Sequence, residues 1–417
     1  MHILLLTAYF PPDVGSASHL FYELGQTLAA RGHRVSVVTG FPGYHASGDL
    51  SRYRGRRWLR EADAGMEIYR IAVPQLARDT PIGRGLWQFS CAASFAFVGL
   101  RVPRPDVALV YSPPLPLALS AHAWRVLRRV PYVVNIQDLF PQSAIDLGLL
   151  RQKPLIRFFE SLERFAYRHA NAITVHSSGN RQHVLAHHGR EAATVVMHNL
   201  VDTGHLRPGP KDNPLSRELG LIDHFVASFA GVMGHSQDLD TILAAAELLQ
   251  AQKSIHFLLV GDGVEKDRLV AKSQAMGLKN VTWLPMQPRD RYPLVLHSSD
   301  AGLTTLHAQV RTPVVPSKIL SNMAAGLPVV AALDPLGDAP RLIADAKAGY
   351  SVPPEDSRAL ADCLLTLYGD PALCRRLGEN GRRYAELHLS ASAVAEQYEN
   401  LFKSILNDTR VSVVYAR

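Results

Sequence analysis

The stretch from Val315 to Ala331, which reads VPSKILSNMAAGLPVVA, contains residue types that suit the binding of an anion. Pro316 fits the first turn of a helix. Ser317, Lys318 and Ile319 follow it, at positions where main-chain N–H groups lack an intrahelical acceptor. The N-terminus of a helix carries a partial positive charge, to which the Lys318 ammonium adds a full charge. The pattern predicts a cradle for a diphosphate group; the alternative is an amphipathic helix with a solvated lysine.

Glycine-containing turns follow a strand-like run in each half of the chain. In the first half, Gly15 and Ser16 precede an amphipathic helix expected near 18–31. In the second half, Gly231 and Gly234 bracket the turn after FVASFA. Small residues allow a diphosphate or a sugar to approach the N–H groups of a helix start, although an ordinary tight turn has the same composition.

Two further patterns in the second half have simpler explanations. Asp238 and Asp240 resemble a metal-binding Asp-x-Asp pair, but Asp238 falls where a helix N-cap is expected, which favours the cap. The run GDGVEKDRL contains Gly261, Asp262 and Gly263 but lacks the third glycine of a dinucleotide fingerprint. We interpret it as a tight strand-to-helix turn and retain Gly261 and Asp262 as candidate binding residues.

The first half offers candidates at the ends of two strand-like runs. Gln137 and Asp138 in NIQDLFP come directly after one run, and His45 in GFPGYH lies in the loop after another. A carboxylate or an amide at the edge of a cleft binds sugar hydroxyls well. The alternatives are a turn cap for Asp138 and a surface position for His45.

The elements that must position these residues form an α/β pattern. Continuous apolar runs alternate with helix-like stretches in both halves, which indicates two parallel sheets, each covered on both faces. In the second half six runs predict strands, namely FVASFAGVMG, HFLLVGDG, NVTWLP, DAGLTTL, LPVVAAL and AGYSVPP, and residues 371–406 read as helical throughout. We therefore expect two Rossmann-like, doubly wound domains, with ligands at the carboxyl ends of the strands.

The break in this alternation places the domain boundary. Residues 206–214 read LRPGPKDNP, a composition typical of a linker. The expected division is an N-terminal domain over 1–205, a C-terminal domain over 215–388 and a C-terminal helix over 389–417. A chain of 417 residues is also too long for one ordinary core.

Composition narrows the class of protein. Three cysteines are too few and too scattered for a disulfide framework or a zinc site, which indicates a reducing compartment. The N-terminal MHILLLTAYFPPD has no basic segment before its apolar run, so we interpret it as a buried strand and not as a signal peptide.

The net charge of +7 arises from an excess of basic residues in the first half of the chain. Residues 1–200 contain 22 Lys and Arg against 13 Asp and Glu, whereas residues 201–417 contain 22 against 24. Such an excess suits an anionic membrane or a nucleic acid. No recognised nucleic-acid-binding motif accompanies it, so we expect no nucleic-acid partner.

Two neighbouring segments predict where a membrane would be contacted. Residues 52–60 read RYRGRRWLR, with five arginines, and residues 85–100 carry no charge. The second segment is shorter than the roughly 20 residues that span a bilayer. It could lie in the interface with its aromatic side chains among the lipids, or form a buried helix. Those side chains are Trp87, Phe89, Phe95 and Phe97.

Taken in order, the motifs resemble those of the family 4 glycosyltransferases of the two-domain GT-B fold. The similar subgroup builds O-antigen, colanic acid and related bacterial surface polysaccharides. The matching pieces span nearly the whole chain and include YFPPDVGSASHLFYELGQTLAARGHRVSVVTGFPGYH, NIQDLFPQSAIDLGLL, FAGVMGHSQDLDTILAAAELL, FLLVGDGVEKDRL and PSKILSNMAAGLPVVAA.

The chain departs from this family at charged positions. Many members carry two glutamates separated by seven residues, and the corresponding positions here are Pro313 and Ser321. The Arg and Lys that neutralise the diphosphate in the family correspond to His235 and Gln237. The main cation left in the motif is therefore Lys318.

The resemblance implies catalytic roles for Lys318 and His235, which would stabilise the leaving diphosphate, and for Asp138 on the acceptor side. It also implies that Ser321 or Asn322 replaces the lost contact with ribose. Preorganised N–H groups with a nearby cation can stabilise the developing charge without a metal ion. No cofactor is expected beyond the nucleotide sugar, which is a substrate.

The implied activity is a retaining, metal-independent transfer of a hexosyl or N-acetylhexosaminyl group from a UDP-sugar. The implied acceptor is a polyprenyl-diphosphate-linked or free oligosaccharide, bound by the N-terminal domain across a central cleft from the donor. The resemblance also implies that the C-terminal helices cross back and brace the N-terminal domain. The expected location is cytoplasmic, peripheral on the inner face of the plasma membrane. Two alternatives are a non-catalytic sugar-nucleotide-binding partner in a polysaccharide assembly complex and a GT-B-fold epimerase, which would need acid/base carboxylates near the donor sugar.

Overall fold

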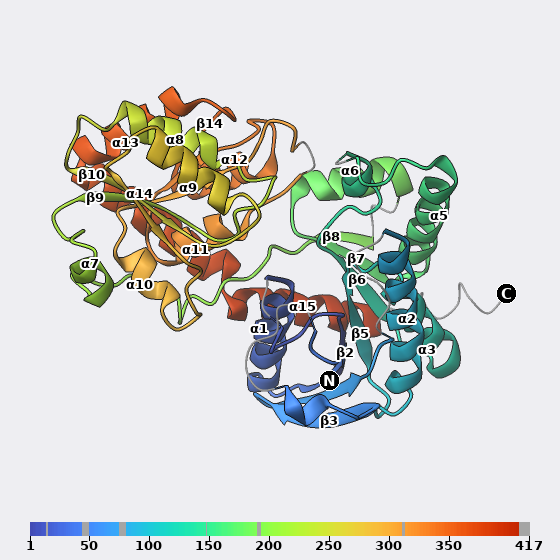
Figure 1. The fold of residues 1–417 in the computed structure, drawn as a ribbon. Helices are drawn as coiled ribbons and strands as arrows, with labels where there is room; N and C mark the ends of the chain where they lie inside the picture. Colours follow the sequence, from blue (N-terminus) through green and yellow to red (C-terminus); the bar gives the residue numbers. More distant parts are fainter. Residues whose placement is uncertain are drawn as a thin grey trace. The chain divides into compact units, whose positions relative to one another are not determined.

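The computed structural model describes residues 1–13, 16–43, 50–74, 81–146, 148–189, 193–310 and 313–407, without the side chains of residues 16, 81, 82 and 84. The chain divides into two compact units (Figure 1). Unit 1 consists of Met1–Asn199 together with Ala391–Arg417, and unit 2 consists of Leu200–Ser390.

Unit 1 contains an eight-stranded sheet in the order β3-β4-β2-β1-β5-β6-β7-β8. Neighbouring strands are parallel except for β3, which runs antiparallel to β4 at one edge. All six residues of β5 are buried, as expected where helices cover both faces. The strands are β1 (His2–Leu6), β2 (Arg34–Gly40), β3 (Trp58–Asp63), β4 (Met66–Ile71), β5 (Val107–Ser112), β6 (Tyr132–Ile136), β7 (Ala172–Val175) and β8 (Thr194–Val196).

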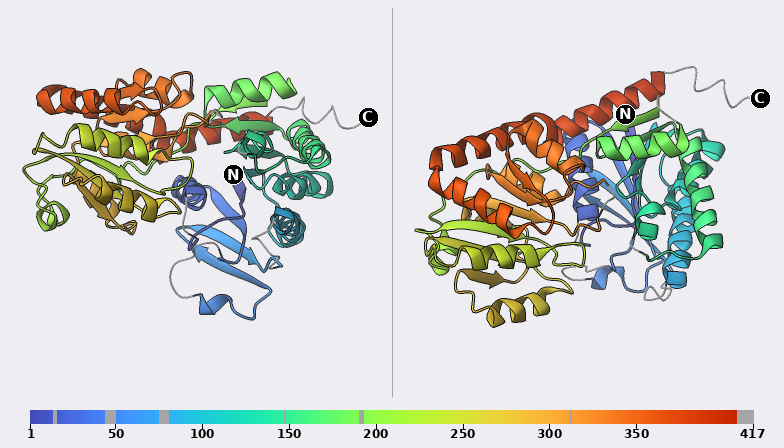
Figure 2. Two further views of the ribbon diagram at one scale, coloured as in Figure 1. Left: turned by 45° about the horizontal axis from the view of Figure 1, so that its top comes forward. Right: turned by 90° about the horizontal axis from the view of Figure 1, so that it is seen from above.

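Helices cover this sheet, and Figure 2 shows α2, α3 and α5 together on one side of it. The α-helices of unit 1 are α1 (Ser16–Ala30), α2 (Pro81–Gly99), α3 (Leu117–Arg128), α4 (Gln142–Asp146), α5 (Lys153–His169), α6 (Ser178–His188) and α15 (Ala391–Asn407), and a 3-10 turn spans Ser51–Tyr53.

Helix α2 contains the charge-free segment and belongs to the core. Trp87 is 6% exposed and Phe95 is fully buried, so for these two side chains the alternative of a buried helix is correct and insertion into a membrane is excluded. Their helix packs against α3, where a β-carbon on Gly99 would lie 2.0 Å from the Trp124 ring. Phe97, in contrast, is 58% exposed. No helix among the described residues is long and apolar enough to cross a membrane.

Unit 2 contains a six-stranded parallel sheet in the order β11-β10-β9-β12-β13-β14. These strands coincide with the six runs predicted from the sequence, and the expectation of two Rossmann-like α/β units is confirmed. The strands are β9 (Phe225–Ala230), β10 (Ile255–Val260), β11 (Val281–Leu284), β12 (Ala301–Thr305), β13 (Val329–Ala332) and β14 (Gly349–Val352).

Two hydrophobic clusters pack on the faces of this sheet and join it to its helices. The helices of unit 2 are α7 (Pro214–Glu218), α8 (Leu239–Leu248), α9 (Lys266–Ala275), α10 (Tyr292–His297), α11 (Ser317–Ala324), α12 (Asp338–Ala346), α13 (Ser357–Gly369), α14 (Pro371–Tyr384) and a π-helical turn at Ala385–Leu389.

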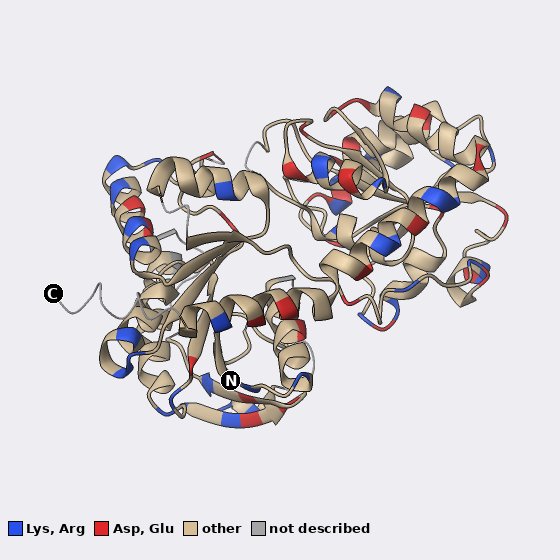
Figure 3. Ribbon diagram, turned by 180° about the vertical axis from the view of Figure 1, so that it is seen from behind, with Lys and Arg blue, Asp and Glu red and all other residues tan. Residues whose placement is uncertain are grey.

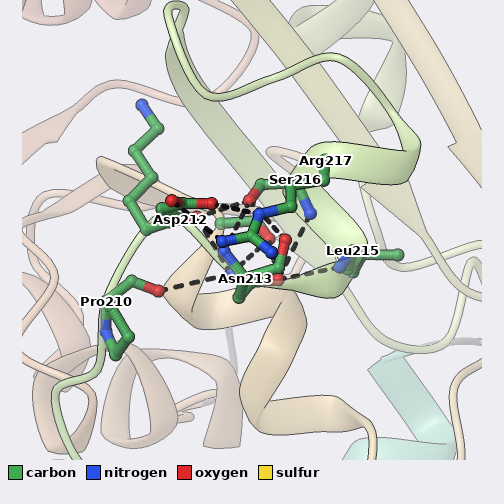
Figure 4. A network of polar contacts seen from close by, with 8 residues as sticks. Pro210, Asp212, Asn213, Leu215, Ser216 and Arg217 are labelled. Atoms are coloured by element: carbon green, nitrogen blue, oxygen red, sulfur yellow. Dashed lines mark hydrogen bonds and ion pairs between the residues drawn. The ribbon is translucent and has the colours of Figure 1, made fainter.

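The segment 206–214, predicted as a linker, lies within unit 2, because the chain already enters this unit at 199–200. A capping box anchors it there (Figure 4). The Asn213 side chain accepts hydrogen bonds from the Leu215 and Ser216 main-chain N–H groups at 2.9 and 3.2 Å. The Ser216 hydroxyl accepts from the Asn213 N–H at 3.0 Å. Beside them, Arg217 donates to Asp212 at 2.6 Å. This reciprocal arrangement satisfies N–H groups that begin α7.

Residues 371–406, predicted as helical throughout, are interrupted at Ser390, and α15 begins at the next residue. The chain passes between the units at 199–200 and again at 390–391. Beside these points the Val201 N–H donates to the Leu389 carbonyl at 2.8 Å, and Val201 forms a parallel bridge with Ser390. The chain segments that enter and leave unit 2 are therefore bonded to each other.

Helix α15 is part of unit 1, although it follows unit 2 in the sequence. The Glu399 carboxylate accepts from Arg31 at 2.6 Å and lies 3.0 Å from the His33 ring. The buried Tyr398 hydroxyl accepts from the Asn135 amide at 2.9 Å and lies 3.3 Å from the Thr174 hydroxyl. These polar contacts fix the register of α15 against the sheet and α1.

We predict that Glu399→Gln destabilises the protein. The Arg31 hydrogen bond lowers the pKa of Glu399 to about 2 against the opposing effect of burial, with a further contribution from His33. A depressed pKa means that the stabilisation is complete above the unfolded pKa, near 4.5, and is lost as the pH falls toward 2. Urea denaturation at pH 7 should show a loss of roughly 1.5–3 kcal/mol, which shrinks as the solution is acidified.

The matched control is Glu396→Gln, an exposed glutamate of the same helix. Its unfolding free energy should stay within about 0.5 kcal/mol of the parent protein. Equal stability of the two variants at pH 7 would contradict the role given to Glu399.

Candidate functional site

The carboxyl ends of β9 and β10 carry two turns that pack directly on each other. Gly231 and Gly261 have φ angles of +149° and +154°, which residues with a side chain rarely adopt. A β-carbon on Gly261 would lie 1.9 Å from the Gly231 carbonyl oxygen. Both glycines are therefore required for this close approach, and the turns hold the loop that leads to α8 against the loop that leads to α9.

Lys318 of α11 lies against the first of these turns. Its ammonium donates to the Gln237 side-chain oxygen at 2.9 Å and lies 4.7 Å from the centre of the Phe229 ring. A β-carbon on Gly231 would come within 2.6 Å of the lysine side chain, so this glycine also makes room for it. Desolvation by burial lowers the pKa of Lys318 to about 8.

The electrostatics around Lys318 favour an anion. Among the described residues, no carboxylate forms an ion pair with it, and its partners are an amide oxygen and an aromatic face. Partial burial without a counter-ion is unfavourable, and a bound anion removes that cost. Ser317 and Lys318 also begin α11, where N–H groups have no intrahelical acceptor. The arrangement can hold a phosphate or diphosphate group.

Ile319 and Asn322 of the same motif lie in the core. The Ile319 N–H donates to the Pro316 carbonyl at 3.0 Å and its side chain is fully buried, so the cradle has two N–H groups where three were predicted. Asn322 is 4% exposed, and its amide packs against the main chain of Gly302. Neither side chain is available to a ligand.

Ser321 stands at the position where many members of the family carry the second glutamate. It is half-buried and its hydroxyl forms a hydrogen bond with that of Tyr292. Burial raises the pKa of Tyr292, so this phenol is neutral near pH 7. The position therefore offers neutral hydroxyl groups in place of a carboxylate.

His235 lies on the surface near the glycine turn. Its side chain is 80% exposed, and its Nδ1 atom lies 2.6 Å from a carboxylate oxygen of Glu265. The Gln237 N–H donates to the Gly234 carbonyl at 2.9 Å, which closes the turn and aims the Gln237 side chain at Lys318. Of the predicted residues in this loop, Gln237 is the one in direct contact with Lys318.

The acidic residues of these loops are engaged with protein groups. Asp238 caps α8 by accepting from the Thr241 N–H at 3.2 Å, as the sequence favours. Asp240 pairs with Arg268 and Lys272 at 2.7 and 2.6 Å. Arg268 is the largest cause that lowers the pKa of Asp240 to about 2. Among the described residues, no group of three or more His, Cys, Asp or Glu is arranged to hold a metal ion.

Asp262 joins the second turn to its surroundings. It pairs with Lys266 at 2.7 Å and accepts from the Met286 N–H at 2.9 Å. It therefore fixes the loop after β11 beside the glycine turns.

Sequence reasoning missed a charged cluster at the ends of β12 and β14. The His307 ring lies 4.0 Å from Asp238 and 3.7 Å from Glu355. The main-chain N–H of His307 donates to the Ser236 carbonyl at 3.1 Å. Glu355 has a φ angle of +64°, in the left-handed region that is uncommon for a residue with a side chain. No local pattern could have paired residues from three separate loops.

In unit 1, the predicted pair Gln137 and Asp138 follows β6 as expected. The Gln137 amide exchanges two hydrogen bonds with Asn199 at 2.9 and 2.8 Å, and donates to Asn135 as well, so its side chain is engaged. Asp138 is exposed, yet the surrounding protein raises its pKa by desolvation. Its charge contributes to the raised pKa of the buried Tyr111, after the larger effect of burial.

The remaining candidates of unit 1 are only partly described. Gly15 and His45 lie outside the described residues, and so does the side chain of Ser16, the first residue of α1.

A cavity of about 150 Å³ opens at the carboxyl ends of β1, β2 and β4 in unit 1. It is smaller than the roughly 300 Å³ of the smallest ligand pockets. The buried Asp13 accepts from the Gly43 N–H at 3.0 Å in its wall. Sequence reasoning missed this site, whose lining includes Ala8, Tyr9, Asp13, Phe41, Val73, Trp87 and Cys91.

Two family models match successive parts of the chain. The Glycosyl transferase 4-like domain matches residues 15–199, within unit 1, and Glycosyl transferases group 1 matches residues 216–384, within unit 2. Lys318 and the glycine turns lie in the second match, and Asp138 lies in the first.

Relatives agree with this assignment. One relative is WcaI of Escherichia coli strain K12, whose name describes it as a glycosyl transferase of colanic acid biosynthesis. It is 25% identical to this chain over 78% of this chain and 82% of its own length. The O-antigen chain mannosyltransferase C of Escherichia coli is 26% identical over 95% of this chain and 96% of its own length.

Among solved structures, HepE of Anabaena in complex with UDP shares the fold with a TM-score of 0.72 at 20% identity, covering 97% of this chain and 100% of that one. Since the two family models together account for most of the sequence and the folds agree, this chain belongs to the family 4 glycosyltransferases of the GT-B fold.

Proposed function

We propose that the protein transfers a sugar from a nucleotide diphosphate sugar, a UDP-sugar, to a growing surface polysaccharide, with retention of anomeric configuration and without a metal ion. The observation that carries this proposal is Lys318, a partly buried cation with an amide oxygen as its partner at a helix start. A diphosphate provides the negative charge that this position lacks.

The chemistry follows from the charge that develops as the donor reacts. When the bond between the sugar and the phosphate breaks, the diphosphate gains negative charge, and donors already in place stabilise it best. Lys318 and the first N–H groups of α11 supply such donors, and His235 supplies a further one when protonated. With a pKa of about 8, Lys318 is mostly protonated near pH 7.

Two kinds of observation support the donor and acceptor classes. HepE, which shares the fold, has been solved with UDP and with UDP-glucose. The names of WcaI and the mannosyltransferase place those proteins in colanic acid and O-antigen synthesis. We infer a lipid-linked oligosaccharide acceptor on unit 1, where Asp138 and the cavity lie, and a cytoplasmic site on the inner face of the membrane.

The deciding experiment uses the full chain and a panel of nucleotide sugars. Thermal shift should select one base and sugar, and that donor should then be consumed in the presence of EDTA, with release of the nucleoside diphosphate. Epimerisation without release would favour an epimerase. Binding without turnover, with lipid-linked acceptor present, would favour a non-catalytic partner in an assembly complex.

Lys318→Ala should weaken UDP binding by about ten- to a hundredfold, because one charge-assisted contact is worth roughly 1.5–3 kcal/mol. For the parent protein, UDP affinity should fall as the pH rises through about 8, where the free lysine loses its proton. Isothermal titration calorimetry between pH 6.5 and 9.5 measures both effects. Lys253→Ala, an exposed lysine of unit 2, should bind as the parent does. If Lys318→Ala binds UDP with unchanged affinity, the assignment of this helix start as a diphosphate cradle is wrong.

Asp138→Asn should impair transfer far more than donor binding, because Asp138 lies in the unit assigned to the acceptor. We expect a loss of about ten- to a hundredfold in kcat/KM for the acceptor, with UDP affinity within about twofold of the parent value. Steady-state kinetics with the acceptor varied, together with calorimetry of UDP, separates the two. Asp146→Asn serves as an exposed control. An equal loss of UDP binding would rule out an acceptor role.

The variant Ser321→Glu tests whether the protein already contacts the ribose hydroxyls of UDP at this position. A carboxylate here should accept from the ribose hydroxyls and raise UDP affinity by about tenfold. The gain should disappear with 2′,3′-dideoxy-UDP, which lacks those hydroxyls. If UDP binding does not improve, the hydroxyl groups of Ser321 and Tyr292 already fill the position.

A further inference from the structure

We propose that the outward face of α5 in unit 1 docks on an anionic lipid surface. The helix separates its side chains into two faces. The inner face contributes Phe159, Leu162, Ala166 and Tyr167 to the core. The exposed positions carry Lys153, Pro154, Leu155, Arg157, Phe158, Ser161, Arg164 and Arg168.

The distribution of charge on α5 is unlike that of an ordinary solvated helix. Glu160 is half-buried and Glu163 is buried, so among the described residues of this helix no acidic side chain occupies an exposed position. Solvated helices usually mix both signs of charge on their outer face. Figure 3 shows the basic segments along α5. The outer face of α5 is complementary to a negatively charged surface.

Apolar side chains stand among these basic groups. Leu155 is 36% exposed and Phe158 is 49% exposed. The Phe158 ring lies 5.9 Å from that of Phe89 on α2, where Leu86 is 54% exposed. Leu149, in the turn before α5, is 68% exposed. The apolar surface therefore extends from α5 onto α2.

A lipid headgroup region satisfies both kinds of side chain at once. Basic groups contact the phosphates while neighbouring apolar side chains enter the boundary of the acyl chains. A helix of 17 residues extends about 25 Å, enough to lie in the plane of the interface. An acidic polymer in water would match the charges alone and leave the leucines and Phe158 hydrated.

The arginine run near β3 matches this chemistry less well. Arg52 lies 3.5 Å from Glu61 and Arg60 lies 3.0 Å from Glu67, so two of its five charges are paired. The aromatic side chains predicted to accompany the run include Trp87 and Phe95, which are in the core. We therefore place the docking surface on α5 and not on the arginine run.

The location of α5 connects docking to the acceptor. Helices that follow parallel strands begin at the carboxyl edge of the sheet, and α2 and α5 come after β4 and β6. Asp138 and the cavity of unit 1 lie at this same edge. This consequence rests on the proposed function, since a lipid-linked acceptor would present its sugar beside the docked helix. The docking itself does not depend on it.

Vesicle flotation tests the surface. The full chain should bind vesicles of phosphatidylcholine with phosphatidylglycerol at low salt and bind phosphatidylcholine alone weakly. Replacing three basic residues in the variant Lys153→Gln, Arg157→Gln, Arg164→Gln should reduce partitioning on the order of 100-fold. The variant Leu155→Ser, Phe158→Ser should lose the part of the binding that persists at high salt.

The matched control changes more charge at another place. A variant with Arg52, Arg54, Arg56, Arg57 and Arg60 all changed to Gln should keep its partitioning within about tenfold of the parent protein. Thermal shift with UDP on each preparation verifies folding, and it separates this test from the proposed function, because docking and donor binding can fail independently.

Three results would overturn the proposal. The first is unchanged flotation of the α5 triple variant, and the second is loss of flotation confined to the variant with five arginines changed. The third is a parent protein that stays at the bottom at low salt but forms a dimer that the triple variant breaks, which would make the face an interface between copies.

Discussion

A partly buried lysine whose partner is an amide oxygen is the interaction on which the candidate site depends. The Lys318 side chain passes over the Phe229 ring and against Gly231, where a β-carbon would lie within 2.6 Å of it. Gly231 must in turn receive Gly261 at its carbonyl oxygen. Phe229, Gly231 and Gly261, at the ends of two neighbouring strands, therefore together accommodate the Lys318 ammonium at the end of β9. Such a charge, which has no carboxylate partner among the described residues, is better explained by a role in anion binding than by a role in stability.

The sequence is a good guide to features that depend on local pattern. Strands buried on both faces appear as continuous apolar runs, so the six strands of unit 2 could be placed from FVASFA to GYSV. The cap at Asp238 followed from residue type and position. A proline-led helix start with a lysine also has a recognisable order of residues, which makes Lys318 a candidate from the sequence alone.

Features that depend on distant partners could not be found this way. Gln137 is paired with Asn199, 62 residues away, and His307 with Glu355 across two strand ends. The helix period alone does not say whether a charge-free face meets lipid or the protein's own sheet, which is why the sequence left both possibilities open for Trp87 and Phe95. The Ile319 N–H donates to the Pro316 carbonyl in the first turn of α11. Residue propensities do not predict this hydrogen bond.

The return of the chain to unit 1 as α15 has a consequence for synthesis on the ribosome. Domains usually fold as they emerge, the N-terminal one first. Here Tyr398 and Glu399, which bond to the sheet and to Arg31, are made after the whole of unit 2. Unit 2 is continuous in sequence and has all its residues once Ser390 has emerged, while unit 1 still lacks a helix. The first unit to begin translation is thus the last to be completed, and its α1 face stays open to solvent or to a chaperone until then.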